Sequence, residues 1–450
     1  MTKVTRERSE VLDRMEVIYS PKCGLANRLT MTSTSAPFRV NGCSISVGGL
    51  VPMHLTSVRK DGNHFWQGVG VSLCQERSKI KAYGEFIERY CAYYTQDEEQ
   101  PFFVVDSYAN LVSQGYSCLD PNKLIPFEDH QYNMSGFPYS KYTSDIPITW
   151  NKGLNLSTNE SILIPAEKVY LSPQYSDCAA LHIPTMSTGL ACGSSLSQAT
   201  LAAVYEIIER DSFMLTWNAK LPGIRIDVDH INCPDLKAVY AHTTKHLLGE
   251  DRLAIFDISR TIGVYTILAF IRNDLPSAVG LVVATASSSS PETAVLKVLE
   301  ELSQVHSYAY NYHIDSNNEE YRDMHTNEID TLVKHMLYYT NCKHNSNIDF
   351  IFSSGEKINL SEMIDHTCSS PEKNLAKIID ILSTLNHDLF FVDITRPEFH
   401  AIGFKAVKAI LPDYLDINRS HNFRHLNNVR QKNILADLGR SISDAPHPFA

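Results

Sequence analysis

The sequence predicts a mixed α/β (α+β) fold, in which helices and strands alternate within one compact unit. A chain of 450 residues with 43% hydrophobic and 20% charged side chains can bury a large core. Residues 75–94 carry apolar side chains at three- and four-residue intervals, which predicts an amphipathic helix. Residues 252–259 and 264–273 are apolar runs on either side of Gly263, which predicts two neighbouring strands.

The first half of the chain is predicted to hold one long helix and one strand pair. Residues 1 to about 60 lack strong periodicity, so loops and short strands are expected there. A Gly-x-Gly turn at 68–70 leads into the helix at 75–94. Paired strands are expected within 148–171, around a turn at 157–159.

The second half is predicted to hold two further helices and a second set of strands. The helix at 197–217 is rich in Ala and Leu, and the helix at 291–312 has Pro in its first turn, where a missing N–H costs little. Residues 311–377 are polar and charge-mixed, which predicts a helical elaboration of the surface. Strand character returns in 387–395 and 403–412.

Charge and cysteine usage exclude several classes of protein. The formal net charge is -11 and no extended Lys/Arg run occurs, which disfavours nucleic-acid binding. The N-terminus lacks an apolar signal region and no stretch approaches about eighteen uninterrupted apolar residues, so a soluble cytoplasmic protein without a membrane segment is expected. The ten cysteines include no Cys-x-x-Cys pair, which argues against a zinc or redox motif and favours buried free thiols.

A turn followed by a helix occurs twice, with the copies 121 residues apart (189 − 68). Each helix carries two Glu residues three positions apart and an Arg four positions after the first Glu, so all three lie on one face. The positions that match without a gap are Gly68 and Gly189, Ala82 and Ala203, Glu85 and Glu206, Ile87 and Ile208, Glu88 and Glu209, and Arg89 and Arg210.

A single Glu-x-x-Glu-Arg helix is most often a solvated face, but two copies in register with an upstream glycine favour a site built from two facing helices. Four carboxylates brought together repel one another unless cations neutralise them. Hard oxygen ligands suit Mg²⁺, which shares its shell with phosphates and water, so ATP is the expected common ligand. The two arginines either bind phosphate oxygens or pair with the first Glu of their own helix. On the third helix, Glu300 and Gln304 are candidate further ligands or adenosine contacts, and no P-loop sequence occurs.

At these residues the sequence resembles the YcaO family, from about Gly68 to Pro412. The resemblance implies a YcaO fold with an internal pseudo-repeat, in which two packed α/β halves enclose an ATP site. Similar segments are "YGEFIERY", "STGLACGSSLSQATLAAVYEIIERDSF", the strand pair around Gly263, the helix of Glu300 and Gln304, and "FVDITRPEFHAIGFKAVKAILP". By the same matching, Glu85, Glu88, Glu206 and Glu209 surround Mg²⁺ and phosphate, Glu300 and Gln304 complete the nucleotide site, and Arg89 and Arg210 stand near it.

Two positions depart from the family pattern. The chain has Val69 where family members commonly have Lys in a Gly-Lys-Gly turn, and it has Lys81 where they have Ser. Because Lys81 lies one helical turn before Glu85, its ammonium is expected to supply the charge that Val69 lacks.

The C-terminal tail, 441–450, is similar in part to the Pro-x-Pro-x-Pro ending of azoline-forming members of the family. Pro446 and Pro448 are present, and Ala450 replaces the last proline. If the tail enters the site, the Ala450 carboxylate is expected to serve as a base for proton removal; the alternative is a disordered end. Cys192 lies in the turn before the second motif helix, and no covalent role is assigned to it.

The chain as a whole looks like the stand-alone D protein, the cyclodehydratase component of azol(in)e-peptide clusters. The resemblance implies that ATP phosphorylates the amide oxygen as Cys, Ser or Thr of a ribosomal precursor peptide becomes thiazoline or (methyl)oxazoline. It implies a leader-binding C protein (ocin-ThiF-like) as partner. A flavin-dependent azoline dehydrogenase as a further partner, and a homodimer, are also compatible with it. The expected division is an N-terminal segment 1–60, a catalytic domain 61–440 and the tail.

Two alternatives to cyclodehydration stay open. The same fold could perform another ATP-dependent amide modification, forming a thioamide or an amidine. The chain could also act as a scaffold of a modification complex without catalysis.

Overall fold

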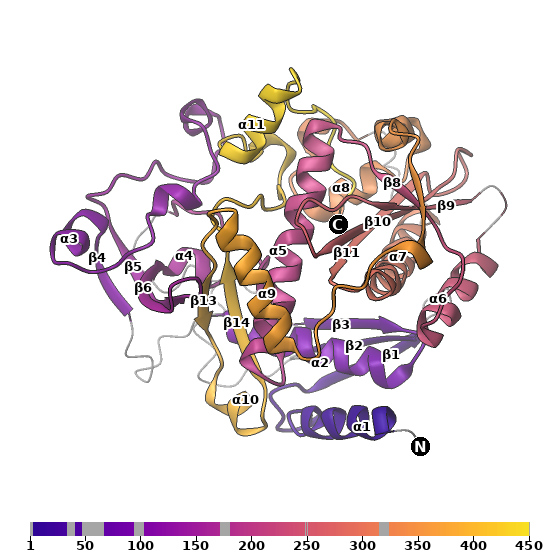
Figure 1. Ribbon diagram of the computed structural model, residues 1–450, viewed down its shortest axis with the longest axis horizontal. Coiled ribbons are helices and arrows are strands. Elements are labelled where there is room, and N and C mark those ends of the chain that lie inside the picture. Colours follow the sequence, from indigo (N-terminus) through magenta and orange to yellow (C-terminus); the bar gives the residue numbers. More distant parts are fainter. Residues whose placement is uncertain are drawn as a thin grey trace. The chain divides into compact units, whose positions relative to one another are not determined.

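A computed structural model describes residues 3–33, 41–46, 67–93, 103–171, 181–247, 249, 251–314 and 324–449 (Figure 1). Much of the predicted N-terminal segment, Cys178 and Ala450 lie outside these described residues. The described residues form two units. Unit 1 contains those of Met1–Thr32, Asn41–Val204 and Ser369–Asp413, and unit 2 those of Tyr205–Cys368 and Tyr414–Ala450.

The first copy of the sequence repeat is strand β3 (Gln67–Ser72) followed by helix α2 (Gln75–Ala92). The strand lies directly against the helix because two of its residues have no side chain. A Cβ on Gly68 would collide with the main chain of Ala82, and a Cβ on Gly70 would collide with it as well. This close approach explains why the chain has glycine at both positions, which lie in a strand and not in the turn that the sequence predicted at 68–70.

The second copy is strand β7 (Leu190–Gly193) followed by helix α5, which continues from unit 1 into unit 2. Helix α5 begins at Leu196, which is 121 residues after α2 begins at Gln75 (196 − 75). The helices predicted over 75–94 and 197–217 are therefore confirmed, and the repeat holds at the level of secondary structure.

Unit 1 holds two sheets, in the orders β1-β2-β3 and β4-β5-β13-β14-β7, with β6 paired to β5. The strand pair predicted within 148–171 is confirmed as the antiparallel pair β5 and β6, and its turn contains Asn159 with a φ of 60°. The strands predicted at 387–395 and 403–412 are confirmed as β13 and β14. The remaining elements of unit 1 are β1 (Arg28–Ser33), β2 (Asn41–Ser46), β4 (Phe103–Ser107), β5 (Pro147–Asn155), β6 (Glu160–Pro165), β13 (Phe390–Asp393), β14 (Lys405–Ile410), α1 (Lys3–Glu16), α3 (Tyr108–Ser113), α4 (Ala166–Val169), α9 (Pro371–Thr384) and α10 (Pro397–Ala401).

Unit 2 is built on a five-stranded sheet in the order β11-β10-β9-β8-β12. Helix α7 lies against β11 and β10, as Figure 1 shows. Every residue of β11 is buried, including its hydroxyl-bearing residues Thr285 and Ser287, so these side chains need internal partners. The elements of unit 2 after α5 are β8 (Ile224–Asp227), β9 (Arg252–Asp257), β10 (Tyr265–Arg272), β11 (Leu281–Ser288), β12 (Lys357–Asn359), α6 (Pro234–Lys245), α7 (Pro291–Ile314), α8 (Leu332–Tyr338) and α11 (Val429–Asp437).

The sequence predicted a helical elaboration of the surface over 311–377, but part of this segment, within 324–368, is helical and contributes to the core of unit 2. Most of the α8 side chains are buried, including His335, and β12 extends the sheet beside β8. The prediction took polarity as a sign of exposure, but the polar groups here have internal partners. For example, the buried Asn345 donates from Nδ2 to the Asn273 carbonyl at 2.9 Å.

Membrane helices and disulfides are both missing from the described residues. None of the helices there combines the length and apolarity that a membrane crossing requires. Nine cysteines are described and all are free thiols; only Cys43 and Cys91 are fully buried. The prediction of free thiols is confirmed for these nine, whereas their burial is confirmed for only two.

Asp211 on α5 connects that helix to the last helix of unit 2. Its carboxylate is fully buried, accepts a hydrogen bond from Leu415 N at 2.8 Å and pairs with Arg430 Nη1 at 2.7 Å. Removing one partner of a buried pair leaves the other charge without compensation. We expect Asp211→Asn to lower the free energy of unfolding by about 3 kcal/mol, measured by urea denaturation.

The matched control is Asp349→Asn, which removes one carboxylate from the exposed pair with Arg272. Its side chain is 55% exposed, so the expected change is below about 0.5 kcal/mol. Equal effects of the two substitutions would contradict the role given to Asp211.

Candidate functional site

The first Glu-x-x-Glu-Arg motif forms a hydrogen-bonded cluster on α2 in unit 1. The Val69 N–H donates to Glu85 Oε2 at 2.7 Å, which fixes this carboxylate against strand β3. The Arg89 guanidinium lies between the two carboxylates, 3.5 Å from Glu85 Oε1 and 3.7 Å from Glu88 Oε1. Arg89 thus pairs within its own helix, and its binding to phosphate stays a prediction.

Lys81 also faces strand β3 from α2. Its Nζ donates to the Val71 carbonyl at 3.2 Å, two residues along the strand from Val69. The ammonium therefore lies against the strand that carries Val69. Its contact with phosphate stays a prediction.

The second motif forms a similar cluster in unit 2. Arg210 Nη2 lies 3.6 Å from Glu206 Oε1, and its Nη1 lies 3.3 Å from Glu209 Oε1. Glu209 accepts hydrogen bonds from Thr285 Oγ1 at 2.8 Å and from Ser287 N at 3.2 Å. A strand thus fixes the first Glu of the motif in one copy and the second Glu in the other, so the two clusters are related but not identical.

The Glu209 carboxyl is the most perturbed acid of the two motifs. Its burial raises its pKa to about 8, the nearby Arg210 guanidinium opposes this shift, and the carboxylate of Glu301 adds to it. Burial also disfavours the charge on Arg210, but Glu209 and Glu206 outweigh this and raise the pKa of the guanidinium. A cation near Glu209 would favour its ionised form.

Helix α7 contributes a residue that the sequence did not single out. The sequence predicted Glu300, which is buried, and Gln304, which is half-buried. The structure adds Glu301, whose charge acts on both Glu209 and Arg210. The signal was available, because Glu301 lies three residues before Gln304 and so shares a helix face with it.

The end of the chain is docked in unit 2, where the sequence allowed either a site element or a disordered end. Trp217 Nε1 donates to the Ala445 carbonyl at 3.0 Å, and Tyr339 Oη donates to the Pro446 carbonyl at 2.5 Å. The Phe449 ring is buried and lies under Arg210, 4.1 Å from the guanidinium carbon. The described tail therefore ends at the second motif, and Phe449 is a site residue that no pattern in the sequence had indicated.

Two buried histidines hold the tail. The rings of His335 and His447 stack with centroids 3.8 Å apart, and His335 Nδ1 donates to the His447 carbonyl at 2.9 Å. His447 Nε2 donates to the Asn418 carbonyl at 2.9 Å, and its Nδ1 accepts from Phe449 N at 3.3 Å. These partners fit a neutral imidazole with its proton on Nε2, because a proton on Nδ1 would face the Phe449 N–H.

The histidine contacts predict a pH-dependent tail. Burial lowers the pKa of His447 to about 4 and that of His335 well below its ordinary value. The folded state therefore binds fewer protons than the unfolded state as the pH falls from about 6.5 to 4, and stability is lost across this window. We expect His447 alone to lower the free energy of unfolding by about 3 kcal/mol at pH 4. The fluorescence of Trp217 measures this loss.

The control for this prediction is His447→Gln, which keeps a side-chain amide but cannot titrate. The variant is expected to show a smaller dependence on pH, with the remainder due to the other histidines whose pKa burial lowers, which include His335, His306 and His421. Identical pH profiles for both proteins would show that His447 does not set the stability of the docked tail.

Cys192 does not have the character of a nucleophile. Burial raises the pKa of this thiol well above its ordinary value, and the charge of Glu88 adds to the shift. The thiol therefore stays protonated at neutral pH, in agreement with the absence of a covalent role.

The structure groups the predicted carboxylates two by two, with Glu85 and Glu88 in unit 1 and Glu206 and Glu209 in unit 2. No three metal-ligating side chains of the described chain are grouped as a metal site. The donors nevertheless fit Mg²⁺ and phosphate: they are hard oxygens, and the buried Nη1 of Arg210 has no hydrogen bond although Glu209 is close. A site shared by all four carboxylates stays a prediction.

Comparison with protein families gives one match, which covers most of the chain. A family model described as "YcaO cyclodehydratase, ATP- and Mg²⁺-binding" matches residues 69–415. A protein of Methanothermobacter thermautotrophicus is 24% identical over 269 residues, which are 59% of this chain and 65% of that protein.

Solved structures share the fold at low sequence identity. A "heterocyclase in complex with substrate and cofactor" has a TM-score of 0.75 and 17% identity, over 98% of this chain and 57% of that chain. A YcaO protein from Methanopyrus kandleri bound with AMPPCP and Mg²⁺ has a TM-score of 0.62 and 15% identity, over 90% and 91%. The E. coli microcin synthetase McbBCD complex has a TM-score of 0.58 and 15% identity, over 86% and 88%. The chain thus spans less than two thirds of the matched M. thermautotrophicus protein and of the heterocyclase.

Proposed function

Because the chain belongs to the YcaO family, we propose that it is an ATP- and Mg²⁺-dependent enzyme that activates backbone amide bonds of a peptide. The reaction we propose is cyclodehydration, in which Cys, Ser or Thr residues of a ribosomal precursor peptide become thiazoline or (methyl)oxazoline rings. One observation carries the proposal: the buried carboxylate of Glu209 and the end of the docked, proline-containing tail both contact Arg210.

The cofactors would be held by the charged residues of the repeat and of α7. When bound, ATP would supply the phosphoryl group that makes the amide oxygen a good leaving group, and Mg²⁺ would neutralise the charge on that group. The proposed metal ligands are Glu85, Glu88, Glu206 and Glu209, the proposed phosphate contacts are Lys81, Arg89 and Arg210, and the proposed remaining nucleotide contacts are Glu300 and Gln304.

The described contacts would prepare these side chains for binding. Val69 N–H fixes Glu85, and the β11 donors Thr285 and Ser287 fix Glu209, so both carboxylates are oriented before a ligand arrives. Donors that are already oriented spend no energy on reorganisation during the reaction. Holding the substrate amide beside them would supply most of the remaining acceleration.

The tail is proposed to act in the same site. Pro446 and Pro448 restrict the backbone of the docked segment, and the described tail ends on Arg210. We propose that the Ala450 carboxylate removes a proton from the substrate during ring closure. Appending a few residues after Ala450 should then abolish cyclisation and leave folding intact, so undiminished cyclisation would contradict this role.

The proposed partners follow from the reaction. Residues 61–440 would form the catalytic domain, and a leader-binding C protein (ocin-ThiF-like) would deliver the precursor peptide. A flavin-dependent azoline dehydrogenase would oxidise the rings in a later step. A homodimer is a further arrangement to test by light scattering.

Mass spectrometry of a precursor peptide separates cyclodehydration from thioamide formation and from a scaffold. The purified chain would be incubated with its C partner, the peptide and Mg-ATP. Cyclodehydration removes about 18 Da per modified residue, whereas exchange of a carbonyl for a thiocarbonyl adds about 16 Da. An unchanged mass, with ATP hydrolysis also missing, would favour a scaffold and overturn the proposal.

A further inference from the structure

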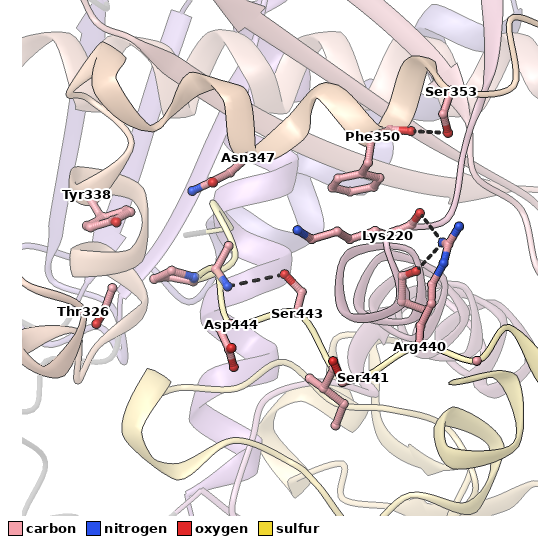
Figure 2. A pocket seen from close by; sticks show the side chains of 15 residues that line it. Lys220, Thr326, Tyr338, Asn347, Phe350, Ser353, Arg440, Ser441, Ser443 and Asp444 are labelled. Carbon is pink, nitrogen blue, oxygen red and sulfur yellow. Dashed lines mark hydrogen bonds between the residues drawn. The ribbon is translucent and has the colours of Figure 1, made fainter. Parts of the chain in front are cut away.

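A cavity of about 840 Å³ lies in unit 2, apart from the residues of the two motifs (Figure 2). One wall is residues 439–446, the chain that leads into the docked tail, and other lining residues lie between Tyr338 and Ser353. Lys220, directly after α5, projects into the space between Phe350 and Ser443, as Figure 2 shows.

Lys220 occupies an unfavourable backbone conformation. Its φ is 50°, in the left-handed region where glycine or asparagine usually ends a helix. A lysine there costs conformational energy that a glycine would avoid. Its ammonium makes no ion pair or side-chain hydrogen bond with another described residue, so the chain keeps an uncompensated charge at this position.

Arg440 adds a second cation to the same cavity. Its Nη1 donates to the Ala219 carbonyl at 2.9 Å and to the Lys220 carbonyl at 3.0 Å, which caps the end of α5. No carboxylate of the described residues pairs with it. The acid that lines the cavity, Asp444, already pairs with Arg424 at 3.4 Å.

Another arginine-lined cavity of unit 2 shows the contrast. It has a volume of about 500 Å³ and lies at β8–β10, with Arg225 and Arg272 among its lining residues. There, Arg225 pairs with Asp227 at 3.5 Å and Arg272 pairs with Asp349 at 2.6 Å. Two of the three arginines of that cavity are thus paired with carboxylates of the chain, whereas Lys220 and Arg440 of the larger cavity pair with no carboxylate of the described residues, which leaves their charges for a ligand.

We propose that the larger cavity binds a segment of the peptide substrate that carries a carboxylate side chain. Its volume lies in the range of small-ligand pockets and exceeds the needs of a single carboxylate or phosphate. Tyr338 and Asn347 offer a hydroxyl and an amide to a peptide main chain, and Phe350 offers a ring face to an apolar side chain. Because the chain has a net charge of -11, most of it repels an acidic peptide. Lys220 and Arg440 would therefore direct such a peptide to this cavity.

The position of the cavity suits a substrate segment. Residues 443–449 lead from the cavity wall to the Arg210 cluster, a path of about 20 Å for extended chain. A bound peptide of similar length would have its acidic part in the cavity and its reacting amide near the second motif. Naming the ligand a substrate rests on the proposed function, whereas the binding of an acidic peptide does not.

Binding is tested without nucleotide, so that its outcome is independent of turnover. The probe is a short fluorescein-labelled peptide of Gly, Ser and Glu, compared with the same peptide carrying Gln in place of Glu, by fluorescence anisotropy with the full chain. We expect the Glu peptide to bind about tenfold more tightly than the Gln peptide. Lys220→Gly and Arg440→Gln should each weaken the Glu peptide about tenfold, whereas Lys237→Ala, an equal charge loss on α6, should not.

The design keeps the proposal falsifiable. Glycine fits the backbone of Lys220, so Lys220→Gly is expected to unfold at the same or a higher temperature than the parent chain. Equal affinity for the Glu and Gln peptides, or unchanged binding by Lys220→Gly, would overturn the proposal. Displacement of the peptide by millimolar inorganic phosphate at constant ionic strength would assign the cavity to a compact anion and would overturn it too. A failure of cyclodehydration would appear separately, as an unchanged peptide mass.

Discussion

Replacing Glu209 by Gln is expected to lower the rate of ATP-dependent peptide modification by about three orders of magnitude. Glu209 is the motif carboxylate with the least solvent around it, and its orientation is fixed by Thr285 and Ser287. A charge in such a place interacts strongly with a bound cation. The amide of glutamine has the same shape but no charge, so it would lose this interaction and keep the packing.

The same substitution should leave the fold intact. Because burial raises the pKa of Glu209 to about 8, its ionised form is disfavoured in the folded state. Its contribution to stability is greatest below its ordinary pKa and is lost as the pH rises towards 8. A neutral glutamine avoids this loss. Glu206 and Glu301 still compensate the charge of Arg210 in the variant, so we expect Glu209→Gln to unfold at the same or a higher denaturant concentration than the parent chain above pH 7.

The measurement compares kcat for peptide modification with the unfolding midpoint for the same preparations. Glu356→Gln is the matched control, because this exposed residue of unit 2 loses the same charge. We expect it to change neither quantity. Activity of Glu209→Gln within about tenfold of the parent chain would remove Glu209 from the proposed metal site.

Local patterns in the sequence were sufficient to predict much of the fold. The helices α2, α5 and α7 follow from runs of apolar residues at helical spacing, and the antiparallel pair β9 and β10 follows from two apolar runs around Gly263. The repeat was visible because Gly68 and Gly189 keep the same distance from their helices. Each of these features depends on residues close together in the chain, where spacing alone determines which side chains share a face.

The partners of the site residues could not be predicted in the same way. Glu209 is held by Thr285 and Ser287, which are 76 and 78 residues further along the chain, and these two positions read as ordinary strand residues. The stacked pair His335 and His447 joins residues 112 positions apart (447 − 335). Such pairs depend on how distant segments pack against each other. The spacing of residues within one segment does not indicate which other segment it contacts.

Replacing Phe449 by Leu is expected to lower kcat about a hundredfold, because small displacements of positioning groups have large effects on rate. The Phe449 ring lies under the Arg210 guanidinium, and it also contacts the Phe213 ring with centroids 5.3 Å apart. Leucine fills most of the same space but has no ring face for a cation. Arg210 would then lose one of the contacts that hold it beside Glu206 and Glu209.

A general loss of stability must be separated from a loss of positioning. Phe404 in unit 1 is the matched control, because it is also buried and its ring centroid lies 4.9 Å from the guanidinium carbon of Arg14. Phe404→Leu should cost a similar free energy of unfolding, about 2 kcal/mol, without a comparable change in kcat. We expect KM for ATP to stay within about threefold in Phe449→Leu, because the aromatic contact positions Arg210 and does not itself bind nucleotide. If both substitutions lower kcat equally, the tail contributes stability alone, and Arg210 does not depend on Phe449 for its position in the reaction.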